Sequence, residues 1–120
     1  MIEIMSETEE KVLAVKATEK LTFEDYEEVF IPKLNQLIQK YGKIRVLMYF
    51  DEDFAGWETE AAWDDAKFGI QHKNDFEKIA VVGGPKWVEW ATRIGAYFID
   101  GEVKTYEASD IQDAISWAKK

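Results

Sequence analysis

Three acidic residues stand at the point where an apolar run of the sequence ends. The run, Ile44–Phe50, is apolar except for Arg45, and Asp51, Glu52 and Asp53 follow it directly. Two such carboxylates with bound water can hold Mg²⁺ or Ca²⁺. The alternative is that one acid bonds the loop backbone while the others are solvated. Consecutive residues seldom converge on one ion, so we expect this alternative and predict no metal site.

The sequence contains a single histidine, His72, and no cysteine. A histidine can act as a general base near neutral pH. However, the chain offers no cysteine nucleophile, no second histidine and no serine elbow motif for His72 to activate. A lone histidine near a helix end more often packs or caps. We therefore predict no catalytic residues and a protein that is not an enzyme.

Gly83-Gly84-Pro85 follows an apolar stretch and precedes a helical pattern. Backbone N–H groups at such a junction can bind an anion. Pro85 removes one of these donors, and the G-x-G-x-x-G pattern of dinucleotide sites is absent. The three residues predict a tight strand-to-helix turn and no cofactor.

Five large rings fall in two loop-helix units that follow apolar strands. Each ring contributes about 2 kcal/mol or more when it is buried, so most are expected in the core or in an interface. We predict Trp63 in the core. Phe54, Trp57 and Trp90 fit equally well in the core or on a surface that meets an apolar ligand or a second copy. The rings are Phe54, Trp57, Trp63, Trp87 and Trp90.

Composition limits the range of functions. The chain has 120 residues, which predicts one domain over 1–120, and its net charge is −9 with 24 acidic against 15 basic residues. The electrostatic field of a protein with this negative net charge repels nucleic acid and anionic membranes. No signal-peptide pattern and no apolar run of membrane-spanning length occur, and the lack of cysteine gives no sign of an oxidising compartment. We expect a cytoplasmic protein.

Periodicity predicts the elements that position these residues. Ile2–Met5 and Val12–Ala17 read as a hairpin, and residues 44–50 and 79–82 as buried strands. Thr22 and Asp25 form a variant capping box for a helix that reaches Gly42 and is kinked or split at Pro32. Three further helices are expected. One is capped by Thr59, reaches about His72 and has the inner stripe Ala62, Trp63, Ala66 and Ile70. The second has Pro85 as its first residue and ends at Gly95, and the third begins at a Ser109/Gln112 capping box and has the stripe Ile111, Ala114, Ile115 and Ala118.

Residues 96–107 allow two arrangements. Tyr97–Ile99 and Val103–Tyr106 can form a hairpin around Asp100-Gly101, a pair that suits a type I′ turn. Alternatively, residues 96–100 form an apolar loop and only 102–107 form a strand. From residue 44 onward strands alternate with helices, which predicts a largely parallel sheet covered on both faces. Ligands of such sheets bind at the carboxyl ends of the strands, which points to the loop 51–57.

Several segments also resemble a known family. The segments Gly56-Trp57, Trp63-Asp64-Asp65-Ala66-Lys67-Phe68 and Asp75-Phe76-Glu77-Lys78-Ile79-Ala80-Val81-Val82-Gly83 are similar to those of the SpoIIAA-like proteins. These small bacterial domains are related in fold to the STAS domain of anti-sigma-factor antagonists. The resemblance covers nearly the whole chain. Its most recognisable part is the run from Asp75 to Val82.

The resemblance implies an α/β fold with a mixed, mostly parallel sheet of about five strands flanked by about four helices, the first strand being antiparallel. It also implies kinship with the lipophile-binding CRAL-TRIO architecture. The antagonists carry a phosphorylatable serine in the loop after a central strand. Here the comparable loop has no hydroxyl before Thr59, so no site residue carries over.

The resulting functional prediction is a non-enzymatic protein-interaction or regulatory module that binds a protein partner or a second copy as a homodimer. The alternative is a binder or sensor of a small hydrophobic, lipid-like ligand. The candidate surface for either comprises Asp51, Glu52, Asp53, Phe54, Trp57, Thr59 and Trp90.

Overall fold

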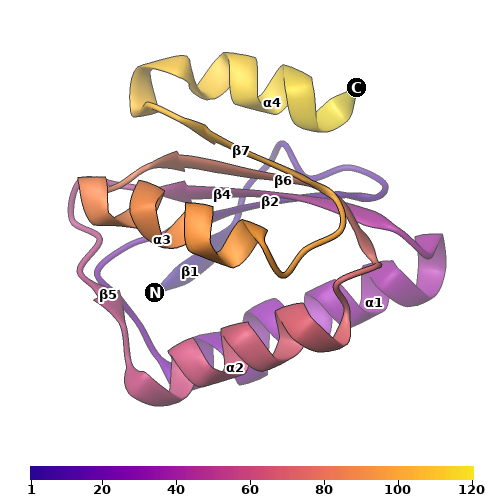
Figure 1. Cartoon of the computed structure of the whole chain (residues 1–120), viewed down its shortest axis with the longest axis horizontal. Coiled ribbons are helices and arrows are strands. Elements are labelled where there is room, and N and C mark those ends of the chain that lie inside the picture. Colours follow the sequence, from indigo (N-terminus) through magenta and orange to yellow (C-terminus); the bar gives the residue numbers. More distant parts are fainter.

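A five-stranded sheet forms the centre of the molecule (Figure 1). The computed structural model describes all 120 residues. The first strand is antiparallel to its neighbour and the others are parallel, which confirms the predicted fold class. In spatial order the strands are β1 (Ile2–Ile4), β2 (Val12–Ala17), β4 (Ile44–Phe50), β6 (Phe76–Gly83) and β7 (Glu102–Tyr106).

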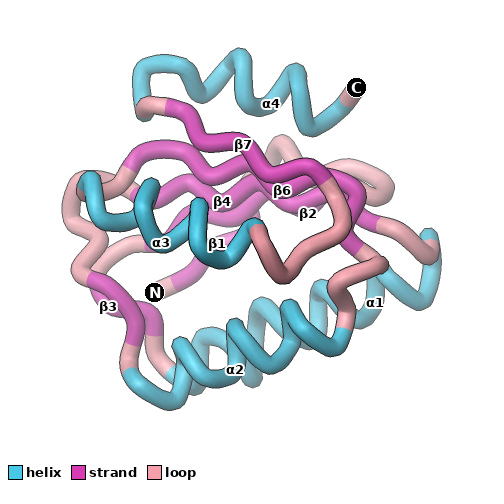
Figure 2. The backbone as a smooth tube through the Cα atoms, viewed as in Figure 1, coloured by secondary structure: helices cyan, strands magenta, loops and turns pink.

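Helices cover the two faces of the sheet unequally. Three of them, α1, α2 and α3, lie on one face, and α4 lies alone on the other (Figures 1 and 2). No helix has the length and apolar character needed to cross a membrane. The helical elements are η1 (Asp25–Phe30, π-helical), α1 (Ile31–Tyr41), α2 (Thr59–Gln71), α3 (Lys86–Ala96), η2 (Ala108–Asp110, 3₁₀) and α4 (Ile111–Lys119).

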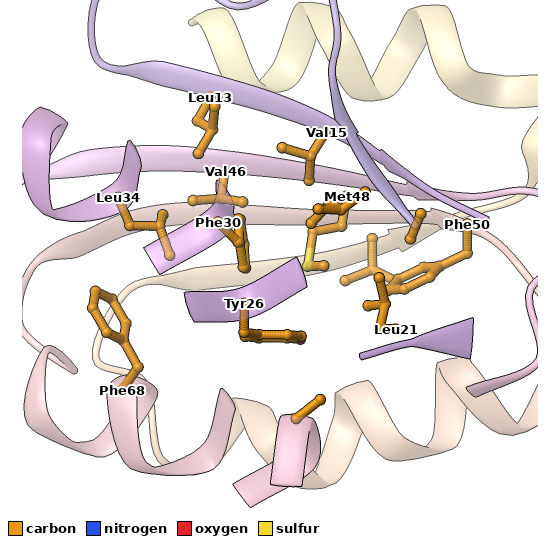
Figure 3. Packing of buried hydrophobic residues seen from close by; sticks show 14 of the residues in the cluster. Leu13, Val15, Leu21, Tyr26, Phe30, Leu34, Val46, Met48, Phe50 and Phe68 are labelled. Atoms are coloured by element: carbon orange, nitrogen blue, oxygen red, sulfur yellow. The ribbon is translucent and has the colours of Figure 1, made fainter. Parts of the chain in front are cut away.

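The central strand β4 contributes to both hydrophobic cores, as its apolar run predicted. Val46, Met48 and Phe50 point to the larger core, which lies between the sheet and the helices α1 and α2 (Figure 3). Leu47 points to the opposite face and packs with residues of α4. The α4 stripe is also confirmed, because Ala114, Ile115 and Ala118 are buried. The sheet is therefore apolar on both sides.

The predicted capping box at the first helix is present. The backbone N–H of Thr22 donates to Asp25 Oδ2 at 2.9 Å, and that of Asp25 donates to Thr22 Oγ1 at 3.1 Å. The predicted split near Pro32 is present as a change of helix type. The turns before Pro32 widen into the π-helix η1, which runs directly into α1 without a gap. A widened turn tolerates proline, which cannot donate the backbone hydrogen bond of a regular α-helix. The two pieces therefore form one continuous layer.

A second, two-stranded ribbon was not predicted. Its strands, β3 (Lys20–Leu21) and β5 (Gly56–Trp57), pair in parallel. Strands of two residues carry no detectable alternation, which explains why sequence periodicity misses them. The ribbon fixes the start of α2 beside the start of η1, and it thereby places Trp57 next to Tyr26.

Helix starts differ from prediction at three positions. Glu58 rather than Thr59 is the N-cap of α2, and the Glu58 carboxylate instead accepts the backbone N–H of Phe23 at 3.1 Å. Pro85 precedes α3 as its N-cap. The Ser109/Gln112 capping box is absent, because residues 108–110 form the 3₁₀ turn η2 and α4 begins after Asp110 without a side-chain cap.

The ambiguous segment adopts the second predicted arrangement, with a loop over residues 97–101 followed by the strand β7. β7 pairs in parallel with β6, so no hairpin forms. Gly101 fits this loop because a Cβ atom there would collide with the backbone carbonyl of Phe76.

Candidate functional site

An apolar cavity of about 560 Å³ lies between the sheet and the three helices on its more heavily covered face. Its volume is within the range of small-molecule sites, roughly 300–1,000 Å³. Of the 25 residues that line it, 21 are hydrophobic. The sheet contributes Val46, Met48, Phe50, Ile79 and Val81, and η1 and α1 contribute Tyr26, Phe30, Ile31 and Leu34; the remaining walls come from α2, α3 and the loop before β7.

Small residues on α2 and α3 leave this cavity open. Glycine inside a helix costs about 0.5–1 kcal/mol relative to alanine. A Cβ atom at Gly95 would meet no atom within 4 Å, and one at Gly69 would meet only Ile99 Cδ1 at 3.9 Å. Larger side chains would therefore fit sterically at both positions. The small lining residues are Ala62, Ala66 and Gly69 on α2, and Ala91, Gly95 and Ala96 on α3.

The cavity opens to solvent between α2 and α3. Residues of both helices line the cavity and are nevertheless exposed, among them Ala62 and Ala66 on α2 and Gly95 on α3. Ile70 and Phe98 also line it and are more than half exposed. An apolar opening of this kind can admit a small molecule without unfolding of the sheet.

Three side chains in the otherwise apolar wall are joined by hydrogen bonds. The indole Nε1–H of Trp57 donates to Tyr26 Oη at 2.8 Å, and the Tyr26 hydroxyl donates to Asp65 Oδ1 at 2.9 Å. The three side chains come from β5, η1 and α2. Figure 3 shows Tyr26 facing the side chains of β4 in the space between the sheet and the helices. Together these side chains form a fixed hydrogen-bond chain at the cavity wall.

The surroundings shift the acidity of both ionisable members of this chain. Burial, together with the negative charge of Asp65, raises the pKa of Tyr26 well above its ordinary range, so its hydroxyl keeps its proton. Asp65 lines the cavity, and its side chain is exposed there. Desolvation by the surrounding wall raises the pKa of its carboxyl group, and the hydrogen bond from Tyr26 offsets only part of the effect.

The acidic loop that the sequence analysis singled out lies elsewhere. Asp51 Oδ1 accepts the backbone N–H of Asp53 at 3.0 Å, while Glu52 and Asp53 are exposed. The loop borders an open depression at the carboxyl end of the sheet, where 5 of 16 lining residues are hydrophobic. No three His, Cys, Asp or Glu side chains are grouped as metal ligands. The bond that Asp51 accepts from the loop backbone is the contact that the alternative interpretation expected.

The aromatic residues divide into a packed cluster and an exposed set. Phe54 is only 4% exposed, and its ring centroid lies 4.4 Å from that of Phe50 and 5.1 Å from that of Trp57. Trp87 joins them, 5.6 Å from Trp57. Of this cluster, Phe50 and Trp57 also line the cavity.

Trp63, which was predicted in the core, is 68% exposed. The prediction was wrong because α2 stands away from the sheet. Ala61 and Phe68 are its buried residues, and Ala62, Ala66 and Ile70 of the predicted inner stripe face the cavity instead. Of the candidate surface residues, Trp90 is 67% exposed and Thr59 is exposed at the start of α2.

His72 makes two local contacts at the end of α2. Its ring stacks on Phe68 with centroids 4.2 Å apart, and its Nδ1 atom lies 2.9 Å from Asp75 Oδ2. These contacts are the packing and end-capping roles expected of a lone histidine. His72 does not line the cavity.

Tyr26 and Asp65 were not predicted as site residues. Tyr26 carried no candidate role, and Asp65 stood only in one of the segments that resemble the family. The two are 39 positions apart, and neither belongs to a recognisable motif. The only available signal was an acid one helical turn after Ala62 and next to Ala66 in the sequence. Periodicity alone does not distinguish such a residue from a solvated acid.

Comparisons with known proteins agree with this architecture. The model of a protein family described as SpoIIAA-like matches residues 12–119. A crystal structure of an uncharacterized protein from Shewanella loihica PV-4, described as belonging to the DUF3478 family and having a SpoIIAA-like fold, is similar with a TM-score of 0.75 and 37% sequence identity. The alignment covers 98% of this chain and 93% of that chain. No curated protein matches the chain significantly.

Proposed function

The chain belongs to the SpoIIAA-like family, and we propose that this member is a non-enzymatic module that binds a small apolar molecule in the cavity beside its sheet. The observation that carries this proposal is the 560 Å³ cavity with its almost wholly apolar lining. Of the two functions that the sequence suggested, the binder of a small hydrophobic ligand fits this geometry better.

The energetics of packing support the proposal. Protein interiors are normally filled to the density of organic crystals, so side chains facing unfilled space lose dispersion contacts. An apolar molecule entering the cavity would restore those contacts and remove apolar surface from water. The open space beside Gly69 and Gly95 would then have a purpose, since larger residues there would compete with the ligand.

The chemistry of the lining supports binding rather than turnover. Asp65 and Thr92 are the polar side chains in the wall besides the ring groups of Tyr26 and Trp57. Thr92 Oγ1 donates to the backbone carbonyl of Val88 at 2.8 Å, and no base activates it. The wall thus offers hydrogen bonding but no pair of a nucleophile and a base.

The proposal is tested with diphenylhexatriene, a hydrocarbon probe that fluoresces in apolar surroundings. We expect saturable binding with one site per chain, accompanied by a change in tryptophan fluorescence because Trp57 lines the cavity. Gly95→Leu should block the site, whereas Gly95→Ala, the matched control, should bind as the unmodified chain does. Equal binding by the Leu and Ala variants, or no saturable binding by the unmodified chain, would rule the proposal out.

A protein-interaction role is the second candidate, and the exposed rings favour it. Trp63, Trp90 and Tyr97 are mostly exposed on α2, α3 and the loop that follows α3. Large exposed apolar patches often mark interaction sites. If these rings mediate homodimer formation, sedimentation velocity should show a dimer that Trp90→Ser converts to a monomer. A chain that stays monomeric at every concentration would exclude the homodimer.

A further inference from the structure

We propose that the ligand of the cavity is an apolar molecule that carries a hydrogen-bond donor, an alcohol or an amine, and that Asp65 binds this donor. The inference rests on the proposed function and specifies the chemical class of the ligand. It follows from how Asp65 is held, from which of its oxygens remains available, and from the charges that the cavity lacks.

The carboxylate of Asp65 is held in a fixed orientation. Trp57 donates to Tyr26 at 2.8 Å, which turns the Tyr26 hydroxyl proton toward Asp65, and Tyr26 donates to Oδ1 at 2.9 Å. This hydrogen-bond chain uses only one of the two oxygens of the Asp65 carboxylate. Oδ2 of Asp65 accepts no hydrogen bond from the protein, and Asp65 lines the cavity. An acceptor is therefore presented to whatever occupies the space.

Charge determines which ligand group can meet this acceptor. No Lys, Arg or His side chain lines the cavity. An anionic head group there would meet the negative charge of Asp65 with no compensating cation, which is unfavourable in apolar surroundings. A hydroxyl or ammonium group would instead donate a hydrogen bond to Oδ2. Desolvation by the cavity wall raises the pKa of Asp65, and a hydrogen-bond donor from the ligand would favour its charged form.

Competition between matched ligands tests this selectivity. Bound diphenylhexatriene is displaced at neutral pH with decanol, decylammonium, methyl decyl ether or decanoate, which share one alkyl chain. Decanol and decylammonium should each compete at least about tenfold better than methyl decyl ether, the difference that one hydrogen bond to a charged group provides. Decanoate should compete most weakly. An ether that matches decanol, or a decanoate that surpasses it, would overturn the inference.

Two variants identify the residue responsible. Asp65→Ala removes the acceptor, so the preference for decanol over the ether should fall to about one while diphenylhexatriene still binds. Glu60→Ala removes the same charge from an exposed position of α2 outside the cavity and should keep the preference. An unchanged preference in Asp65→Ala would contradict the role of Asp65. Failure of the unmodified chain to bind diphenylhexatriene would instead contradict the proposed function, so the two failures are distinguishable.

Discussion

Tyr26 connects the larger core to the cavity wall. Its ring is 1% exposed and meets the ring of Phe30 edge to face at a centroid distance of 5.5 Å. Its hydroxyl accepts a hydrogen bond from Trp57 and donates one to Asp65, so a single oxygen bonds side chains of two other elements. The π-helical turns of η1 thus supply both a core ring and the central member of the hydrogen-bond chain.

Tyr26→Phe should destabilise the protein by about 1–3 kcal/mol, because it leaves the Trp57 indole N–H without its acceptor and Asp65 without its donor. Urea unfolding at neutral pH measures the change. Tyr41→Phe is the control: Tyr41 is exposed and its hydroxyl makes no hydrogen bond, so the change should stay within about 0.5 kcal/mol. Equal effects of the two substitutions would refute a structural role for the Tyr26 hydroxyl.

Glu77 should make the free energy of unfolding depend on pH in the acidic range. Its hydrogen bonds from Arg45 at 2.8 Å and from Lys11 at 3.1 Å lower the pKa of its carboxyl. A lowered folded-state pKa gives stability that is present at neutral pH and is lost as the pH falls from about 5 toward 3. Between these pH values, the urea midpoint should fall less in Glu77→Gln than in the unmodified chain.

The control for Glu77 is Glu102→Gln, since Glu102 is an exposed carboxylate on β7 outside any ion pair. This variant should follow the acid dependence of the unmodified chain. If Glu77→Gln and Glu102→Gln gave the same profile, the interactions of Glu77 with Arg45 and Lys11 would not be the cause.

At the scale of elements, α4 is fastened to its face of the sheet at its carboxyl end. Arg45 on β4 donates to the Ala118 carbonyl at 3.0 Å, and Lys78 on β6 donates to the Trp117 carbonyl at 3.0 Å. The last carbonyls of a helix lack partners within the helix, and the negative end of its dipole favours cations. The two basic side chains thus join α4 to the two central strands.

Arg45→Met should weaken this attachment. It keeps much of the apolar stem of a side chain that is 13% exposed but removes the bonds to Ala118 and Glu77, so we expect a loss of about 1–3 kcal/mol in urea unfolding. Arg93→Met is the control, because it makes the same substitution at an exposed position. Arg93 is 74% exposed and pairs only with Glu89 on its own helix, so its loss should cost at most about 0.5 kcal/mol. Similar losses would show that the α4 carbonyls do not depend on Arg45.

The sequence pattern predicted the main elements and most of their buried positions, but it misplaced Trp63 on α2, a helix that faces the cavity. Strand β4 was predicted from a continuous apolar run, because both of its faces meet packed apolar atoms. The α4 stripe was predicted because every third and fourth residue of that helix meets the sheet. On α2, the same pattern placed Trp63 inside, whereas Ala62 and Ala66 line open space. A sequence pattern records apolar positions, but it does not record whether the opposite side is filled. The Tyr26–Asp65 pairing depends on tertiary packing in the same way.

At the scale of the whole molecule, the two faces of the sheet are packed differently. One helix covers one face with a small core of close-packed residues such as Ala14, Ala80 and Ala114. Three helices cover the other face, yet α2 and α3 leave a cavity between them and the sheet. The family resemblance implied kinship with a lipophile-binding architecture, and the proposed apolar ligand would occupy this cavity.

Occupation of the cavity should therefore stabilise the entire fold. A ligand that binds only the folded chain, present at a hundred times its Kd, adds about 2.7 kcal/mol to the free energy of unfolding. Urea unfolding with and without decanol should show this increase in the unmodified chain. Gly95→Ala should be more stable than the unmodified chain by up to about 1 kcal/mol and should gain as much from decanol, because alanine favours the helix without filling the cavity.

Gly95→Leu separates cavity filling from a general effect of the alcohol. Its side chain enters space where a Cβ at Gly95 meets no atom, so this variant should gain little from decanol. If decanol stabilised the Leu and Ala variants equally, the alcohol would be acting elsewhere on the chain. A destabilisation of all three chains would show that decanol favours the unfolded state, and binding in the cavity would then be excluded as the source of stability.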